Sequence, residues 1–382
     1  MPEVYIIEAL RSPIGVGKPD TGALHPLEPV DLAARILRAV VEHVGLDAAA
    51  IEDVILGCVT PIGDQGANIG RLASLYAGFP VGVPGLQLNR MCGSSQQAIH
   101  FGAQAILSGD MDLVLAGGVE MMSRVPLGRD YPERWPEDFP YELVHQGQSA
   151  EMMAERWSLK REALDDFAYR SHLRAARARA AGAQAGQIVP IEVHNGSGTA
   201  ARVEHDQGVR MSPDRARMGQ LKPVFRDDGV VTAGNSSQVS DGASAVLLAS
   251  ERAVRAHGLK PRARLAARVV VGSDPVLMLD GPIPATRRAL ERAGLSIADV
   301  DWIEINEAFA TVVLAWQAEL KPDPEKVNPQ GGAIAHGHPL GATGGVLMTK
   351  LVHGLATAGG RFGLQTMCIG HGMATATVIE RL

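Results

Sequence analysis

Two long stretches of this chain alternate between strand-like and helix-like patterns, and the two stretches resemble each other. The expected strands cover residues 4–10, 53–59, 86–90 and 112–119, then 243–249, 264–272, 301–305, 362–368 and 373–379. The expected helices cover residues 30–45, 68–77 and 95–108, then 284–293, 308–319 and 343–357. Such alternation predicts an α/β fold of βα units and layered sheets. Because the repeat spans about 240 residues, it indicates a duplicated domain and not a solenoid.

The middle of the chain, residues 121–240, does not follow this pattern. It is rich in Pro, Arg and Gly, with one strong helical pattern at 158–181. Between residues 202 and 226, the basic residues are Arg202, Arg210, Arg215, Arg217, Lys222 and Arg226, against the acids Glu204, Asp206 and Asp214. This excess of positive charge suits either a phosphate-bearing ligand or an ordinary basic surface loop, and the residues alone do not decide between them.

Length, charge and cysteine content argue against several classes of protein. A chain of 382 residues can bury a large core, and a net charge of −6 argues against nucleic acid as a partner. No uncharged apolar run reaches membrane-spanning length, and nothing resembles a signal or transit peptide, so we expect neither a membrane partner nor export. The cysteines Cys58, Cys92 and Cys368 are too few for a disulfide framework, which favours a reducing cytoplasm.

Cys92 stands at a predicted strand-to-helix turn. It follows the strand-like residues 86–89 and precedes a helical pattern that begins near Ala98. A thiol at a helix N-terminus meets exposed N–H groups and the positive end of the helix dipole, which favour the thiolate. Cys92 is therefore a candidate nucleophile, although a buried structural cysteine is an equally ordinary interpretation.

Three further segments place short polar residues in Gly-rich, apolar surroundings. The first begins at Asn306, the second contains His338 followed by Pro339, and the third contains Cys368 and Gly370. Glycine lets backbone N–H groups approach a ligand closely, and strand ends of α/β sheets commonly bind ligands. His338 is thus a candidate base for a cysteine nucleophile.

Together these segments resemble the thiolase family over essentially the whole chain. The four matching blocks are Cys92 before a small-residue helix start, Asn306 to Phe309, Gly337-His338-Pro339 and Cys368-Ile369-Gly370, in the family's order. The resemblance implies a layered α-β-α-β-α fold of two duplicated core domains with an inserted loop domain. We accordingly expect an N-terminal core at 1–120 plus 241–250, a CoA-binding loop domain at 121–240 and a C-terminal core at 251–382.

The resemblance also implies an activity, the cleavage of 3-ketoacyl-CoA by coenzyme A or the reverse Claisen condensation. His338 would take the proton of Cys92, whose thiolate attacks the 3-keto carbon. Cys368 would protonate the acetyl-CoA enolate and later deprotonate coenzyme A. One oxyanion site would combine His338 with a water held by Asn306, and the other would use the backbone N–H groups of Cys92 and Gly370.

The family's coenzyme A contacts carry over to the loop domain and its neighbours. The implied residues are Ser237 for the pantetheine, Ala233, Ala308 and Phe309 along the same tunnel, and Arg210 and Arg217 near the nucleotide phosphates, with Lys222 as an alternative cation. Acyl-CoA and coenzyme A would be substrates, and no cofactor or metal is expected.

Three residues and one segment depart from the family pattern. His371 stands where many thiolases have glycine, His336 stands at an often apolar position, and Gln146 replaces a common Met near the acyl pocket. These changes leave the acyl preference open. The segment between Ser123 and His145 is shorter than in tetrameric biosynthetic thiolases, so we expect a homodimer, with a tetramer as the alternative.

Three other functions are compatible with some of these residues. His336, His338, Cys368 and His371 could bind zinc, which would make the protein a metal-dependent hydrolase. A ketoacyl-synthase-type condensing enzyme would share the fold but lack the second active cysteine. A non-catalytic acyl-CoA carrier would usually have lost the nucleophile or the histidine, and both are present.

Overall fold

The computed structural model describes residues 3–194 and 200–382. The first half contains β1 (Val4–Arg11), β2 (Gly15–Val16), α1 (Pro29–Val44), β3 (Asp53–Gly57), α2 (Ile69–Tyr76), β4 (Gly85–Leu88), α3 (Ser94–Ser108) and β5 (Leu113–Met121). The middle contains α4 (Gln146–Arg156), α5 (Arg161–Ala180), β6 (Ile191–His194), β7 (Ala200–Val203) and α6 (Arg215–Gly219). The remainder contains β8 (Ser240–Ser250), α7 (Glu251–His257), β9 (Ala263–Gly272), α8 (Pro282–Ala293), β10 (Trp302–Ile305), α9 (Ala310–Leu320), α10 (Ala333–His336), α11 (Thr343–Ala358), β11 (Phe362–Ile369) and β12 (Met373–Arg381).

The two halves share one strand arrangement, which confirms the predicted fold class. In the first half, β3 and β5 are parallel, and β8 and β1 follow in antiparallel pairing. In the second half, β10 and β11 are parallel, and β12 and β9 follow in the same way. A short β1–β9 pairing joins the halves into one ten-stranded sheet. β4, parallel to β3, has a counterpart in the isolated parallel bridge between Ile303 and Val327.

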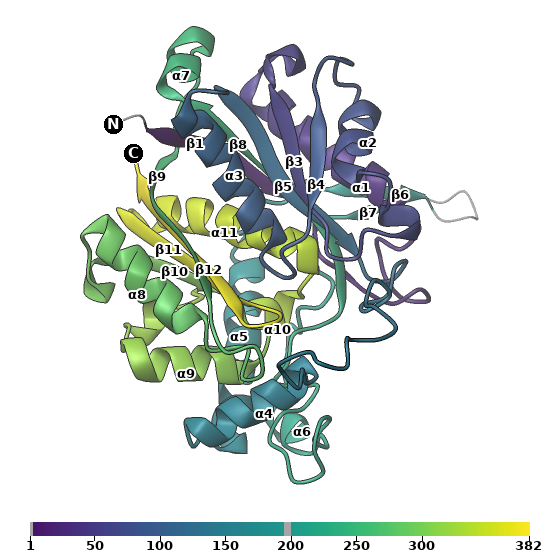
Figure 1. Cartoon of the computed structure of the whole chain (residues 1–382), viewed down its shortest axis with the longest axis vertical. Helices are drawn as coiled ribbons and strands as arrows, with labels where there is room; N and C mark the ends of the chain where they lie inside the picture. Colours follow the sequence, from purple (N-terminus) through teal and green to yellow (C-terminus); the bar gives the residue numbers. More distant parts are fainter. Residues whose placement is uncertain (1–2, 195–199) are drawn as a thin grey trace.

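Helices form three layers around the two half-sheets (Figure 1). The central layer is α3 and α11, which pack on each other, and together they bury strands from both halves, as the cluster around Ile99, Leu351 and Ile379 shows. The helices α1 and α2 cover the outer face of the first half, and α8 and α9 cover that of the second. The polar N-terminus of α3 and the loop before α11 are thereby held between the two half-sheets.

The structure corrects two details of the sequence interpretation. The strand at 243–249, which opened the expected second stretch, lies between β5 and β1 and so belongs to the sheet of the first half. The structure also contains the helices α4, α6, α7 and α10, the short strand β2 and the hairpin β6–β7, which the pattern did not predict. α4 was missed because it opens with Gln146 and Gly147, which carry no apolar period.

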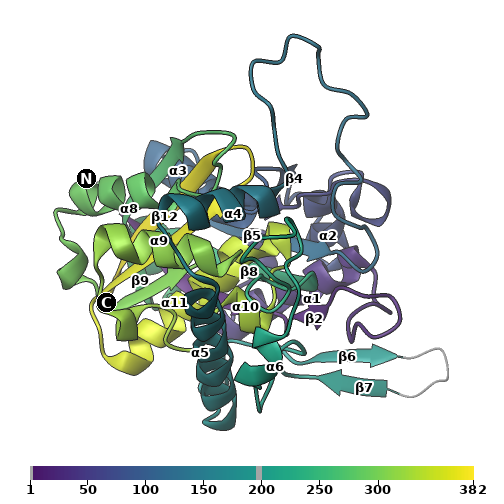
Figure 2. The same ribbon diagram turned by 90° about the horizontal axis from the view of Figure 1, so that it is seen from below.

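The helices α4 and α5 of the middle segment pack against the second half, whereas the β6–β7 hairpin packs against the core of the first half through Ile191 and Val193. α4 and α5 both contact α9, and α5 contacts α10 (Figure 2). The domain boundaries proposed from the sequence stay a prediction. No helix among residues 3–194 and 200–382 is long and apolar enough to cross a membrane.

Candidate active site

His338 lies in the loop before α11, and its surroundings fix its tautomer. Its backbone N–H donates to the Ser240 hydroxyl at 3.1 Å. Its Nδ1 lies 2.6 Å from the Thr343 hydroxyl, which itself donates to the Pro339 carbonyl at 2.8 Å. Because the hydroxyl proton of Thr343 is committed to that carbonyl, the hydroxyl must accept from Nδ1–H. The lone pair of His338 is therefore on Nε2, the nitrogen that can act as a base.

Asn306 follows the end of β10 and faces that lone pair. Its side-chain Nδ2 lies 3.3 Å from Nε2 of His338. The other side-chain atom, Oδ1, is buried and has no hydrogen-bond partner among the described residues. A buried acceptor of this kind is costly unless a donor reaches it. Asn306 can therefore both orient His338 and accept a hydrogen bond from a water or a ligand.

Cys92 lies in the turn between β4 and α3, as the sequence predicted. The turn is sharp, since Met91 has a positive φ of 46°. The backbone N–H groups of Gly370 and of Cys92 itself are near enough to the sulfur to favour its thiolate. Cys92 also packs in one apolar cluster with Leu340 and Ile369. The segments that carry Cys92, His338 and Gly370 thus meet at one place, although they are far apart in the sequence.

The charge state of this site differs from the sequence expectation. Burial raises the pKa of Cys92 to about 12, although the hydrogen bonds from the two N–H groups act in the opposite direction. Burial also lowers the pKa of His338 to about 4. The expected thiolate was wrong for the ligand-free protein, because loss of hydration outweighs the favourable helix N-terminus. At neutral pH the pair is a neutral thiol and a neutral imidazole.

Cys368 lies on β11, one residue before the strand ends, and is buried. Burial raises the pKa of its thiol, and the nearby charge of a Cys92 thiolate raises it further. The two sulfurs are thus close enough to influence each other's ionisation. Both cysteines are free thiols.

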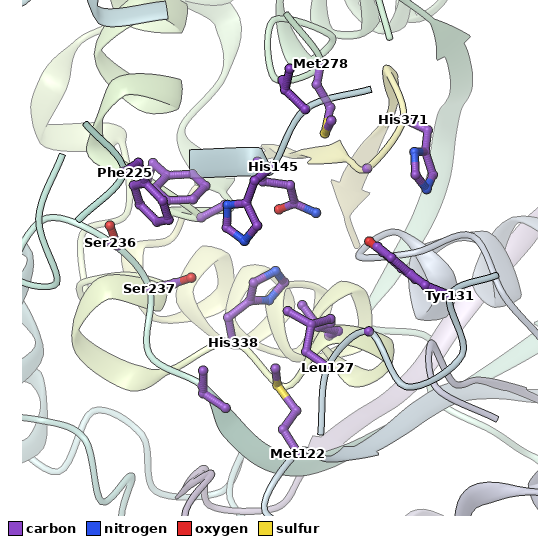
Figure 3. Close-up of a pocket in the computed structure, with 18 of the residues that line it drawn as sticks. Met122, Leu127, Tyr131, His145, Phe225, Ser236, Ser237, Met278, His338 and His371 are labelled. Atoms are coloured by element: carbon purple, nitrogen blue, oxygen red, sulfur yellow. The ribbon is translucent and has the colours of Figure 1, made fainter. Parts of the chain in front are cut away.

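A cavity of about 470 Å³ opens in front of these groups (Figure 3). Its lining includes the predicted residues His338, Gly370, Ser237, Ala308 and Phe309. His338 stands at its centre, with Ser237 on one side and Tyr131 and His371 on the other. Neither cysteine is among the lining residues. Because Gly370 lines the cavity and its backbone N–H affects the ionisation of the Cys92 thiol, Cys92 lies close to this part of the wall.

Other predicted contacts lie outside this cavity. Ala233, Arg210 and Arg217 do not line it. Of the basic residues between 202 and 226, Arg202, Arg215 and Arg226 form ion pairs with carboxylates. In the described part of the chain, no ion pair involves the other three, Arg210, Arg217 and Lys222.

The zinc alternative is not supported by the positions of its proposed ligands. His336 is buried against Asp206, with 2.8 Å between Nδ1 and the carboxylate, and its Nε2 lies 2.8 Å from the Gln330 carbonyl. Within the ranges that the structure describes, no three His, Cys, Asp or Glu side chains gather closely enough to hold a metal ion. Gln146 and His371, the other departures from the family pattern, do line the cavity.

Sequence reasoning missed two groups that build the site. Thr343 sets the tautomer of His338, and only its position five residues after the histidine hinted at a role. The buried carboxylate of Glu120 accepts hydrogen bonds from the N–H groups of Val59 and Gly341, which ties the end of β3 to the loop that carries His338. Its own surroundings in the sequence, a run of apolar and Gly residues, gave no signal.

Comparison with known proteins matches the whole chain. The family model described as "Thiolase, N-terminal domain" matches residues 4–252, and "Thiolase, C-terminal domain" matches residues 259–381. The chain is 48% identical to the steroid 3-ketoacyl-CoA thiolase of Mycobacterium tuberculosis, over 100% of the chain and 95% of that protein. It is 44% identical both to the 3-oxoadipyl-CoA/3-oxo-5,6-dehydrosuberyl-CoA thiolase of Escherichia coli and to a 3-ketoacyl-CoA thiolase of Yersinia pestis, with 100% of each chain covered.

Proposed function

This chain belongs to the thiolase family and is an acyl-CoA C-acyltransferase that acts on 3-ketoacyl-CoA, and we propose that it transfers the acyl group through a thioester on Cys92. One observation carries this proposal. Cys92 packs beside Leu340 and near the Gly370 N–H, and both Gly370 and Leu340 line the cavity that also contains His338. A covalent thioester divides one difficult displacement into two easier ones.

The first half-reaction begins with proton transfer. Nε2 of His338 takes the proton of Cys92, and the thiolate attacks the 3-keto carbon. No hydrogen bond joins the two side chains among the described residues, so the imidazole must close on the thiol when substrate binds, as is common for ligand-free enzymes. The C2–C3 bond then breaks, and its electron pair forms the enolate of acetyl-CoA. Cys368 gives that enolate its proton, and acetyl-CoA leaves.

The second half-reaction returns every proton. The Cys368 thiolate takes the proton of incoming coenzyme A, whose thiolate attacks the acyl group on Cys92. The Cys92 thiolate leaves and recovers its proton from His338. Because burial raises the pKa of both thiols, each thiol keeps its proton in the ligand-free site until a base takes it.

Two donor sets support the charge that develops on carbonyl oxygens. The N–H groups of Cys92 and Gly370, which favour a thiolate on Cys92, would lie close to the carbon that the sulfur attacks. The thioester oxygen of the leaving acetyl group would accept hydrogen bonds from His338 and from a water bound by Asn306. The buried Oδ1 of Asn306 has no other partner among the described residues.

Coenzyme A is proposed to reach the site along the Ser237 side of the cavity. Ser237 lines the cavity, and its backbone N–H donates to the Ala308 carbonyl at 2.9 Å, which holds the two walls together. Arg210, Arg217 and Lys222 remain the proposed cations for its phosphates, with Ala233 beside the same path. Since no step of the proposed scheme needs a metal ion, treatment with a chelator is expected to leave the rate unchanged.

We also propose a homodimer and a reducing compartment such as the cytoplasm. β4 is an edge strand of the sheet. Large apolar side chains are exposed on it and on the neighbouring α2 and α3, namely Leu72, Leu75, Leu86 and Phe101. An edge strand beside exposed apolar residues suits pairing with a second copy. The compartment follows from the chemistry, which needs Cys92 and Cys368 reduced.

The deciding experiment is intact-protein mass spectrometry after mixing with acetoacetyl-CoA. We expect one acetyl adduct on the natural protein, discharged by added coenzyme A, and none on Cys92→Ala. Cys58→Ala is the matched control, since Cys58 is also buried and free but lies against Glu120. An adduct that persists in Cys92→Ala, or none on the folded natural protein with any 3-ketoacyl-CoA, would contradict the proposal.

A further inference from the structure

A long segment without regular structure crosses the cavity on the side away from Ser237. This strap, residues 122–145, joins β5 to α4 and forms the open loop that projects from the molecule in Figure 2. Both of its arms line the cavity: Met122, Leu127, Gly128, Tyr131 and Trp135 on the outgoing arm, and Leu143, Val144 and His145 on the returning arm. Burial raises the pKa of Tyr131, and the charge of a Cys92 thiolate raises it further, so this part of the strap lies within electrostatic range of the nucleophile.

His371 closes the same end of the cavity from the tip of the β11–β12 hairpin. Figure 3 shows His371 and Tyr131 at this end of the cavity. The centroid of the His371 ring lies 6.2 Å from that of Tyr131 and 6.3 Å from that of Trp135, in tilted and edge-on arrangements. Its Nδ1 is buried and has no hydrogen-bond partner among the described residues. His371 therefore carries a polar atom, beside the rings of Tyr131 and Trp135, that no described residue satisfies and that a ligand reaches only when the imidazole or the strap moves.

The backbone at His371 makes this side chain unexpected. Its φ is 63°, in the left-handed region where glycine is favoured and a residue with a Cβ costs free energy. Glycine would fit here without strain, yet the position carries an imidazole that points at the strap. A strained residue at the edge of a reactive cavity is a reason to look for a role in binding.

His145 and Gln146 also line the cavity, and Figure 3 shows His145 nearer to Phe225 than to His371. His145 stacks on Phe225 and accepts the N–H of Gly147 on Nδ1 at 3.1 Å, so its Nε2 carries the proton and is a donor. Gln146 lies next to Gly370, since a Cβ at Gly370 would be 3.4 Å from its Nε2. The strap end of the cavity thus combines aromatic and aliphatic walls with neutral hydrogen-bonding groups.

The absence of positive charge in the cavity lining indicates which acyl groups the cavity can bind. No Lys or Arg of the described residues lines the cavity. A terminal carboxylate would therefore lose its hydration without gaining a cationic partner. A plain alkyl chain would leave Nδ1 of His371 unsatisfied. An acyl group with a ring fits the aromatic faces, and a neutral oxygen on that ring would satisfy the imidazole.

We infer that His371, with the strap residues Tyr131 and Trp135, selects 3-ketoacyl-CoA substrates whose acyl part is a bulky ring that carries a keto or hydroxyl oxygen. This inference rests on the proposed function, because it specifies the acyl group that Cys92 accepts. His371 binds the ring oxygen, and the two aromatic side chains cover the ring.

The experiment compares kcat/KM for two matched synthetic substrates. One is a 3-ketoacyl-CoA ending in a cyclohexyl ring, and the other adds a ketone to that ring opposite the point of attachment. One neutral hydrogen bond predicts a preference of about 5- to 10-fold for the ring ketone in the natural protein. In His371→Gly, whose backbone is unstrained at this φ, the preference falls to about one. In His371→Asn, which tolerates the same φ and keeps a hydrogen-bonding group, part of the preference remains.

A linear substrate and the adduct measurement distinguish failure of this inference from failure of the proposed function. A substrate of similar size that ends in a carboxylate, such as 3-oxoadipyl-CoA, is expected to react more slowly than the ring ketone. If that carboxylate is preferred, or if His371→Gly keeps the ring-ketone preference, the inference is wrong while the thiolase mechanism stands. If no 3-ketoacyl-CoA acylates Cys92 in the folded protein, the proposed function itself fails.

Discussion

At the scale of single residues, the resting site holds neutral groups where the reaction needs charged ones. Cys92 and His338 are both buried, which raises the pKa of the first to about 12 and lowers that of the second to about 4. Between these values neither side chain is charged. Cys92 is therefore a neutral thiol in the ligand-free protein, and it transfers its proton to His338 only after substrate binds.

This charge state predicts how Cys92 reacts with iodoacetamide. Only the thiolate is alkylated, so the rate should be low at pH 7 and should rise steadily with pH above pH 9. A thiolate–imidazolium pair would instead give a reactive plateau between the two pKa values, and finding that plateau near neutral pH would refute the neutral pair. Alkylation is followed by peptide mass spectrometry, with Cys92→Ser to exclude labelling at Cys58 or Cys368.

Thr343 acts through His338, and its removal should show this. Thr343→Val keeps the shape of the side chain but leaves Nδ1–H of His338 without its acceptor. We expect kcat to fall by roughly 10- to 100-fold, because the productive tautomer is no longer favoured. Thr343→Ser keeps the hydroxyl and should retain most of the activity. A merely structural role would instead lower the thermal midpoint of both variants together and leave kcat of the folded protein unchanged.

At the scale of elements, the approach of α3 and α11 sets the position of Cys92. A Cβ at Gly344, in the first turn of α11, would overlap the backbone of Gln96 in α3. Cys92 lies just before α3, and His338 lies just before α11. The close contact between the two helix starts therefore controls how the nucleophile and the base face each other.

Gly344→Ala is expected to be strongly destabilising. Neither helix start can move without shifting the packed layer, so we expect a loss of about 1–3 kcal/mol in the free energy of unfolding. Urea titration measures this loss. Gly82→Ala is the control, because a Cβ at that position would meet nothing within 4 Å. Equal stability of the two variants would show that the helices adjust to the extra methyl group.

At the scale of the whole molecule, the exposed β4 edge predicts the assembly. A molar mass near twice 40.4 kDa is expected in light scattering. Leu86→Lys places a charge on the edge strand and should shift the protein toward monomer, because a buried unpaired charge is costly. Val224→Lys is a control at another exposed apolar residue, away from β4. A mass near four times 40.4 kDa, unaffected by Leu86→Lys, would contradict the proposed dimer.

The order of elements and the family could be read directly from the chain. Strand and helix periods depend on neighbours within a few residues, so the strands from β1 to β12 in both halves were predicted to within a few residues, apart from β2 and the β6–β7 hairpin. The blocks around Cys92, His338 and Cys368 were equally visible, because each is a short local run of residues in a fixed order.

The ionisation of the site and the contacts that surround the acyl group could be described only from the tertiary structure. The pKa values of Cys92 and His338 depend on burial by segments hundreds of residues apart, and the helix-terminus argument, which is local, predicted the wrong direction for Cys92. The roles of Thr343 and Glu120 depend on which backbone groups they meet. Likewise, His371 was visible as a departure from the family pattern, but its contact with the strap required a tertiary structure. Burial and long-range hydrogen bonds sum over the whole fold, and no window of sequence contains them.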